Sequence, residues 1–131
     1  MKRFKKIFSL VLFGMLLTSC SPSQTSHLGY REISVEKAKE LMKTEKNYII
    51  LDVRTPEEYA ESHIPGAINV ANEEIGSEEI PELPDKNQLI LVYCRSGRRS
   101  KEAAKKLVAL GYTNVVEFGG ILDWTGDLEK G

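Results

Sequence analysis

The sequence predicts an α/β domain, with a mainly parallel central sheet of about five strands and helices on both faces. Two observations support this prediction. Short apolar runs, typical of strands buried on both faces, recur along the chain. Between them lie segments whose apolar residues have the spacing of an amphipathic helix. Because an intervening helix lets the next strand run in the same direction, this alternation favours a parallel sheet.

Residues 1–19 are predicted to be a lipoprotein signal peptide. Four basic residues precede the apolar stretch 7–17, which is typical of an export signal. The stretch is shorter than the roughly 20 apolar residues that a membrane-spanning helix needs. The sequence LTSC at residues 17–20 resembles the lipobox of bacterial lipoproteins, which implies lipidation of Cys20. We therefore expect an exported protein, lipid-anchored to the bacterial envelope and facing the periplasm or the cell exterior; ordinary cleavage and an uncleaved anchor are the alternatives.

The domain is expected to span residues 30–131, after a polar, flexible tether at residues 20–29. Ser34 and Thr55 are suited to cap the first two helices, and Pro56 suits a first helical position. In chain order, we predict a helix at 35–43, a strand at 47–53, a helix at 55–61, strands at 67–70 and 89–93, a helix at 99–110, a strand at 114–118 and a turn into helix at 119–124.

The charge distribution excludes some classes of partner. The whole chain has a formal net charge of −1, and removal of the basic leader makes the mature domain more acidic, which argues against nucleic-acid binding. The acidic residues between 73 and 85 have no His or Cys at ligand spacing, so a solvated face is favoured over a metal site. We expect one domain, no metal or organic cofactor, and a monomer.

Cys94 is the candidate reactive residue. It ends a predicted buried strand, and four cations follow within residues 95–101. Ligands of open parallel sheets collect beyond the carboxyl ends of strands, and Cys94 lies at such an end. If Cys20 is lipidated, no other cysteine remains to form an intramolecular disulfide with Cys94. Gly97 can adopt a positive φ at little cost, which a tight turn at this position requires.

A turn of this kind directs backbone N–H groups inward and forms a site for an anion. The following helix dipole and the nearby cations add positive potential, which stabilises a thiolate relative to a thiol. We therefore expect Cys94 to be a nucleophile that acts on a small anion. The alternative is a buried structural cysteine followed by a solvated basic helix start.

Three segments together resemble the single-domain rhodaneses, the thiosulfate sulfurtransferases. These segments are LDVRTPEEYAESHIPGAINV, VYCRSGRRS and GGILDW, in the order that the family has them. The resemblance extends from Arg31 to Trp124, and the tail after Trp124 is shorter than in many relatives. It implies that Cys94 accepts the sulfur and that the loop binds the anionic donor. It also implies that Arg95 and Arg99 help to bind this donor and that the backbone amides of the loop surround the persulfide. The candidate substrate-binding residues are Arg95, Ser96, Gly97, Arg98 and Arg99; for Arg98, a surface charge is the favoured alternative, and Arg95 could also point to solvent.

The resemblance also implies a mechanism in two steps. The Cys94 thiolate attacks the outer sulfur of thiosulfate or a related donor, releases sulfite and becomes a persulfide. The sulfur then passes to cyanide or a small thiol. The planar guanidinium groups suit the charge of the donor.

Three further residues are expected to support the site structurally. Asp52 ends a buried strand and is expected to accept hydrogen bonds from neighbouring loops. Arg54 is expected to pair with Glu58. For His63, a structural role in a turn is favoured over a Cys–His pair.

Two other functions remain open. Cysteine phosphatases of the same fold place five residues between cysteine and arginine, whereas four separate Cys94 from Arg99 here. Ser100 occupies the position of the phosphatase arginine, and the shorter loop makes a smaller cradle that favours a sulfane sulfur over a phosphate monoester. A non-catalytic module that binds an anion or docks a partner would need the cradle but not the thiol.

Overall fold

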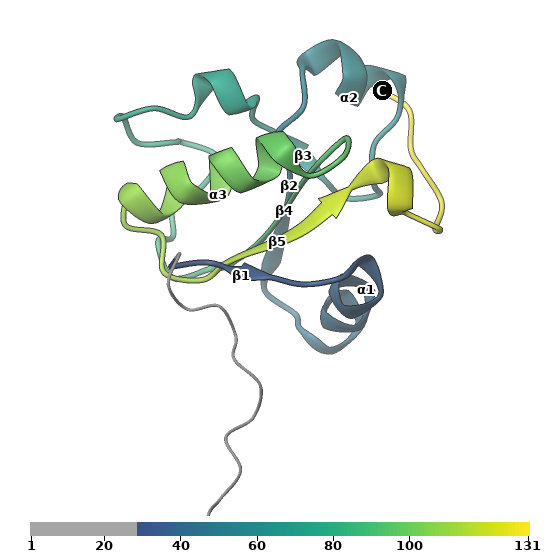
Figure 1. The fold of residues 1–131 in the computed structure, drawn as a ribbon, viewed down its shortest axis with the longest axis horizontal. Helices are drawn as coiled ribbons and strands as arrows, with labels where there is room; N and C mark the ends of the chain where they lie inside the picture. The colour runs from purple at the N-terminus through teal and green to yellow at the C-terminus, as the bar shows by residue number, and fades with distance from the viewer. Residues whose placement is uncertain (1–28) are drawn as a thin grey trace, which may run out of the picture.

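The structure is a computed structural model that describes residues 29–131 (Figure 1). The predicted signal peptide, Cys20 and the tether up to Leu28 lie outside the described residues. The described residues form a parallel sheet in the order β1-β5-β4-β2-β3. The strands are β1 (Arg31–Glu32), β2 (Tyr48–Asp52), β3 (Ile68–Asn69), β4 (Leu89–Cys94) and β5 (Val115–Gly120).

The helices are α1 (Val35–Thr44), α2 (Pro56–Glu61) and α3 (Arg98–Ala109), with short 3-10 helices η2 (Asn72–Glu74) and η3 (Ile121–Asp123). Ser34 caps α1, and Thr55 forms a capping box with Glu58 at the start of α2. α3 begins at Arg98, one residue before its predicted start. The sequence placed four strands; the one it did not place is β1, which is two residues long and too short to show a period.

Two apolar cores cover the two faces of the sheet. One face packs against α3 through Ala104 and Leu107, and the other packs against α1 through Val35 and Ala38. Figure 1 shows α3 and α1 on opposite sides of the sheet. These contacts confirm the predicted α/β fold with helices on both faces. Because both faces are covered, the central strands are mostly apolar.

The parallel strands have their carboxyl ends on the same side of the sheet. Along each strand, successive side chains point to opposite faces. In β4, the side chain of Tyr93 lies in the α1 core, whereas that of Cys94 lies in the α3 core. Asp52, at the end of β2, pairs in register with Tyr93. The end of β4 therefore sends the Tyr93 and Cys94 side chains to opposite faces of the sheet.

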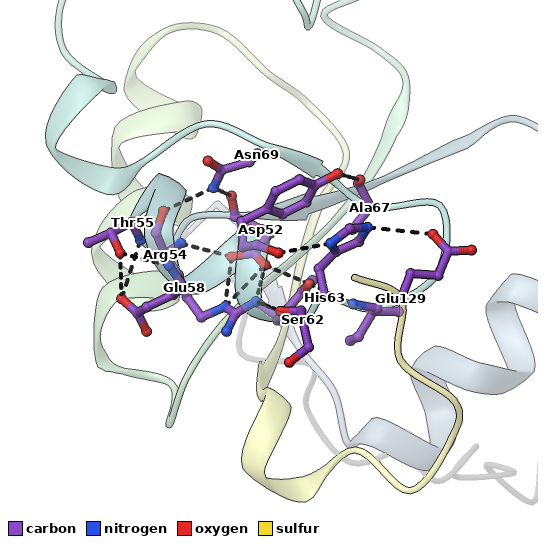
Figure 2. Close-up of polar contacts among 12 residues, drawn as sticks. Asp52, Arg54, Thr55, Glu58, Ser62, His63, Ala67, Asn69 and Glu129 are labelled. Carbon is purple, nitrogen blue, oxygen red and sulfur yellow. Dashed lines mark hydrogen bonds and ion pairs between the residues drawn. The ribbon is translucent and has the colours of Figure 1, made fainter. Parts of the chain in front are cut away.

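Asp52 and Arg54 form the centre of a buried polar network (Figure 2), which includes the Tyr93 hydroxyl. Asp52 accepts hydrogen bonds from the Arg54 backbone N–H (2.9 Å), from Arg54 Nη2 (2.6 Å) and from the Tyr93 hydroxyl (2.7 Å). Arg54 also donates to the Ser62 carbonyl at 2.7 Å. The predicted pairing of Arg54 with Glu58 is wrong, because Asp52 lies two residues before Arg54 and takes its guanidinium within the buried network.

The Asp52–Arg54 pair generates a stability prediction. Asp52→Asn should lower the free energy of unfolding by about 3 kcal/mol, because it leaves the buried Arg54 guanidinium without its charged partner. Chemical denaturation followed by circular dichroism measures this loss. Asp85→Asn, the same change at an exposed turn, should cost less than about 0.5 kcal/mol. Equal losses in the two variants would contradict the assignment of a buried, charge-paired role to Asp52.

Candidate active site

The loop after β4 brings a backbone amide to the sulfur of Cys94. β4 ends at Cys94 and α3 begins at Arg98, so residues 95–97 must turn the chain. Gly97 makes this turn with φ 116°, the positive value predicted from the sequence. In this conformation the Gly97 N–H donates to Cys94 Sγ at 3.0 Å. The turn therefore places a hydrogen-bond donor on the sulfur at the N-terminus of α3.

The sulfur also has a hydroxyl partner, in spite of its burial. The Cys94 side chain is 1% exposed and belongs to the α3 core. Its Sγ lies 3.4 Å from Ser100 Oγ, on the first turn of α3. The sequence alternatives of a nucleophile in a polar loop and a buried cysteine each describe part of this environment: the side chain is buried, and its sulfur contacts an amide and a hydroxyl.

Ser100 and Glu117 are site residues that the sequence analysis did not assign. Ser100 Oγ lies 2.6 Å from Glu117 Oε1, and the Gly119 N–H donates to the same oxygen at 2.8 Å. Burial raises the pKa of the Glu117 carboxyl. A charged residue inside an otherwise apolar strand is the sequence signal that could have drawn attention to Glu117.

The cations of the loop are not all directed at the sulfur. Arg99 forms a two-pronged ion pair with Glu58 of α2, with contacts of 2.7 and 3.1 Å. Arg98 is exposed and lies 3.6 Å from Glu102. The side chains of Arg95 and Ser96 are exposed at the surface of the turn. Arg95 and Arg98 are therefore exposed basic groups, whereas the guanidinium of Arg99 is paired with Glu58.

The GGILDW segment holds the other side of the turn. The Leu122 N–H donates to the Arg95 carbonyl at 3.2 Å. The backbone of Gly120 passes so close to this carbonyl that a Cβ at Gly120 would lie 2.0 Å from the Arg95 oxygen. Because real Cβ atoms do not make contacts this short, only glycine fits here without moving the turn. The GGILDW segment thus fixes the position of the cysteine loop in the VYCRSGRRS segment.

The proposed supporting residues lie apart from the sulfur. Asp52 and Arg54 lie in the network on the Tyr93 face (Figure 2). The His63 ring stacks on Tyr59, and its Nε2 lies 3.5 Å from the Glu129 carboxylate. The structure thus joins His63 to the C-terminal tail on the α1 side of the sheet, and it does not bring His63 to Cys94 within the described residues.

A cavity of about 600 Å³ flanks the turn. Its walls include Ser96 and Gly97 of the turn, Lys101 of α3 and Glu117 of β5. Within residues 29–131, His, Cys, Asp and Glu side chains form no group of three that could hold a metal ion. No helix in this described part of the chain is long and apolar enough to cross a membrane.

The described residues form an α/β domain in which a cysteine-bearing loop follows the carboxyl end of a parallel strand, and comparison with known proteins identifies the family. A family model described as "Rhodanese-like domain" matches residues 34–127, more than half of the chain. The chain therefore belongs to the rhodanese-like domain family.

Relatives within this family share much of the chain. Thiosulfate sulfurtransferase PspE of Escherichia coli (strain K12) is 42% identical over 73 residues, which cover 56% of this chain and 70% of that protein. Putative sulfur carrier protein YrkF of Bacillus subtilis (strain 168) is 38% identical over 99 residues, covering 75% of this chain and 52% of the relative. The chain thus spans about half the length of YrkF.

A solved structure agrees with these relatives. A structure described as "rhodanese with anions from E. coli" is 39% identical, covers 64% of this chain and 99% of the other chain, and has a TM-score of 0.59. The names of these relatives support a role for the chain in the sulfurtransferase family.

The close approach at Gly120 predicts that a single methyl group disrupts the site. Gly120→Ala should displace the Arg95 carbonyl, move the turn off the sulfur and lower the free energy of unfolding by about 2 kcal/mol or more. Denaturation measures the stability, and the alkylation rate of Cys94 reports the turn. Gly76→Ala, where a Cβ meets nothing within 4 Å, serves as the control and should change neither measurement appreciably. Normal stability and alkylation of Gly120→Ala would contradict this account.

The Glu58–Arg99 pair predicts a dependence of stability on pH. Hydrogen bonds from Arg99 lower the pKa of Glu58 to about 2, whereas an unfolded glutamate titrates near 4.3. The pair therefore stabilises the fold above this unfolded value, and its contribution is lost as the pH falls towards the folded value. At neutral pH, Glu58→Gln should cost about 1 kcal/mol, and the difference from the parent should vanish near the folded pKa.

Thermal unfolding across this pH range measures the effect. The exposed neighbour in α2 offers a control, Glu57→Gln, which removes the same charge without touching Arg99. A Glu58→Gln penalty that persists unchanged at the acid end would contradict the ion-pair interpretation.

Proposed function

We propose that this protein is a sulfurtransferase in which Cys94 carries a sulfane sulfur from an anionic donor to a thiophilic acceptor. The observation that carries the proposal is the contact of 3.0 Å between the Gly97 amide and Cys94 Sγ at the N-terminus of α3. An amide and a helix N-terminus both stabilise a negative charge on the sulfur, and the thiolate is the nucleophilic form of cysteine.

The proposed reaction has two steps. The Cys94 thiolate attacks the outer sulfur of thiosulfate, the S–S bond of the donor breaks, and sulfite leaves with the bonding electron pair. The enzyme is then a persulfide at Cys94. A thiol or cyanide next attacks the outer sulfur of the persulfide, takes it away and regenerates the thiolate. Thiosulfate is the proposed donor because PspE, a relative with 42% identity, is a thiosulfate sulfurtransferase.

The exposed cations of the turn support donor binding. Arg95 and Arg98 are exposed next to the turn, and their charge would attract an anion to this part of the surface. The sequence prediction that Arg99 binds the donor stays a prediction, because its guanidinium is held by Glu58. A donor that reaches Arg99 must compete with this carboxylate. The Gly97 N–H is the group best placed to hold the sulfur itself.

Two contacts disfavour phosphatase chemistry. The position of the phosphatase arginine holds Ser100, which contacts the sulfur and Glu117. A guanidinium at that position would supply donors for the oxygens of a phosphate, whereas a buried hydroxyl beside a carboxylate does not. A non-catalytic module remains the second candidate, since an anion could occupy the turn without reacting.

We also propose that the chain is exported and lipidated at Cys20. This rests on residues 1–20, where a basic start and an apolar stretch precede the LTSC sequence. The domain would then face the periplasm or the cell exterior as a monomer held by its lipid and tether. The acceptor would be a small thiol or cyanide available in that compartment.

Intact mass spectrometry of the full chain after thiosulfate treatment tests both proposals. The parent should gain one sulfur atom, lose it on addition of cyanide, and have the mass of a chain that begins at a lipidated Cys20. Cys94→Ser should gain no sulfur, and its thiosulfate:cyanide transfer should fall by a factor on the order of 10³ or more. Hydrolysis of a phosphate monoester by the parent should be negligible.

A matched control separates the two cysteines. Cys20→Ser should keep the sulfur adduct and lose the lipid. A parent that never gains sulfur, or a Cys94→Ser variant as active as the parent, would overturn the sulfurtransferase proposal. An unmodified N-terminus in cells that process lipoproteins would overturn the anchor.

A further inference from the structure

A continuous line of polar atoms runs from the candidate nucleophile to a buried carboxyl group. Ser100 Oγ lies 3.4 Å from Cys94 Sγ and 2.6 Å from Glu117 Oε1. All three side chains are buried, and they come from β4, α3 and β5. The Ser100 hydroxyl has one proton to donate and can accept another hydrogen bond. It can therefore join the sulfur to the carboxyl group in either direction.

We propose that Cys94 and Glu117 share one proton through Ser100, and that Glu117 takes up the thiol proton when the nucleophilic thiolate forms. In this transfer the S–H bond of Cys94 breaks and its proton moves to Ser100 Oγ. The original Ser100 proton moves to Glu117 Oε1. The negative charge passes from the carboxylate to the sulfur, and the total charge of the three groups is unchanged. The inference rests on the proposed function and adds a proton acceptor to it.

The surroundings of Glu117 favour its acid form over the carboxylate. Glu117 is 2% exposed, and burial without a cationic hydrogen-bond partner disfavours a carboxylate. Burial accordingly raises the pKa of Glu117, and the hydrogen bonds from Ser100 and from the Gly119 amide oppose this rise. A carboxyl group with a raised pKa is a better proton acceptor than an exposed glutamate.

The surroundings of the sulfur favour the thiolate form of Cys94. The Gly97 N–H donates to Sγ and can hold a negative charge there. Ser100 Oγ also lies 2.9 Å from the Gly97 carbonyl, which is a competing acceptor for its proton. When Glu117 is protonated, Glu117 can donate to Ser100, and the Ser100 proton is then available to the sulfur.

The other charged groups around the pair have opposite effects. Lys101 of α3 favours an ionised Glu117, and Glu32 of β1 disfavours it. Tyr30 donates a hydrogen bond to Glu32, and Arg99 interacts electrostatically with Cys94. The acidic residues Glu36 and Asp123 line the same cavity as Glu117. This cavity offers solvent a route to the carboxyl group, so that its proton can leave after the sulfur has reacted.

Glu117 acts on the sulfur through Ser100 and is therefore a positioning residue, so its test must be a property that packing alone does not change. We choose the pH dependence of Cys94 alkylation by iodoacetamide in the full chain, followed at the peptide that contains Cys94. Two groups that interact by more than about one pK unit lose their protons in two steps that belong to the pair. The parent should show two steps, and Glu117→Gln should show one.

Further variants make the comparison specific. Ser100→Ala should also give one step, whereas Ser100→Thr keeps a hydroxyl and should restore two. Glu32→Gln removes a charge that faces Glu117 without a bond to Ser100; it should shift the steps and keep both. A Glu117→Gln profile identical to that of the parent would overturn the shared proton.

Infrared difference spectroscopy of the parent gives a second test that needs no variant to fold. At a pH between the two steps, alkylation of Cys94 removes the thiolate, so Glu117 should lose its proton and the band of a neutral carboxylic acid should weaken. An unchanged carboxylic acid band would overturn the inference. Because alkylation needs no sulfur donor, a failure of sulfur transfer alone would affect the proposed function and leave these results interpretable.

Discussion

The hydrogen bond from the Gly97 amide to the Cys94 sulfur is the interaction on which the candidate active site depends. It forms because β4 ends at Cys94, α3 begins at Arg98, and Gly97 alone turns the amide inward with a positive φ. The close passage of Gly120 beneath the Arg95 carbonyl fixes the turn from the opposite side. A rigid donor of this kind needs no rearrangement when the sulfur becomes negatively charged, which makes it more effective than a mobile side chain.

The two faces of the sheet have different tasks. On the Tyr93 face, Asp52 and Arg54 form a fully hydrogen-bonded buried pair that ties the ends of β2 and β4 to the chain before β3. On the Cys94 face, Ser100 contacts the sulfur directly, and Glu117 is connected to it through the Ser100 hydroxyl. Because neighbouring residues of a strand point in opposite directions, the end of β4 serves both purposes without a conflict in space.

The arginines of the loop are not the groups that hydrogen-bond to the sulfur. The conspicuous arginines lie at the surface, and Arg99 is joined to Glu58 of α2. The groups closest to the sulfur are an amide and a hydroxyl, which carry no net charge. In the proposed reaction, the exposed Arg95 and Arg98 would attract an anionic donor, while the uncharged amide and hydroxyl would stabilise the sulfur in more than one charge state. The sulfur exchange that we propose would require this, because Cys94 would alternate between thiolate and persulfide.

The α/β class, most of the helices and strands, and the turn at Gly97 could be predicted from the sequence, because they follow from local patterns: the period of apolar residues, helix caps and a required positive φ. The sequence also singled out Cys94. Which charged groups pair with one another could be seen only in the folded structure. Arg54 pairs with Asp52, Glu58 pairs with Arg99, and Ser100 joins Cys94 to Glu117. These contacts link residues of different elements, so they depend on how the strands and helices pack, and periodicity along the chain contains no record of that packing.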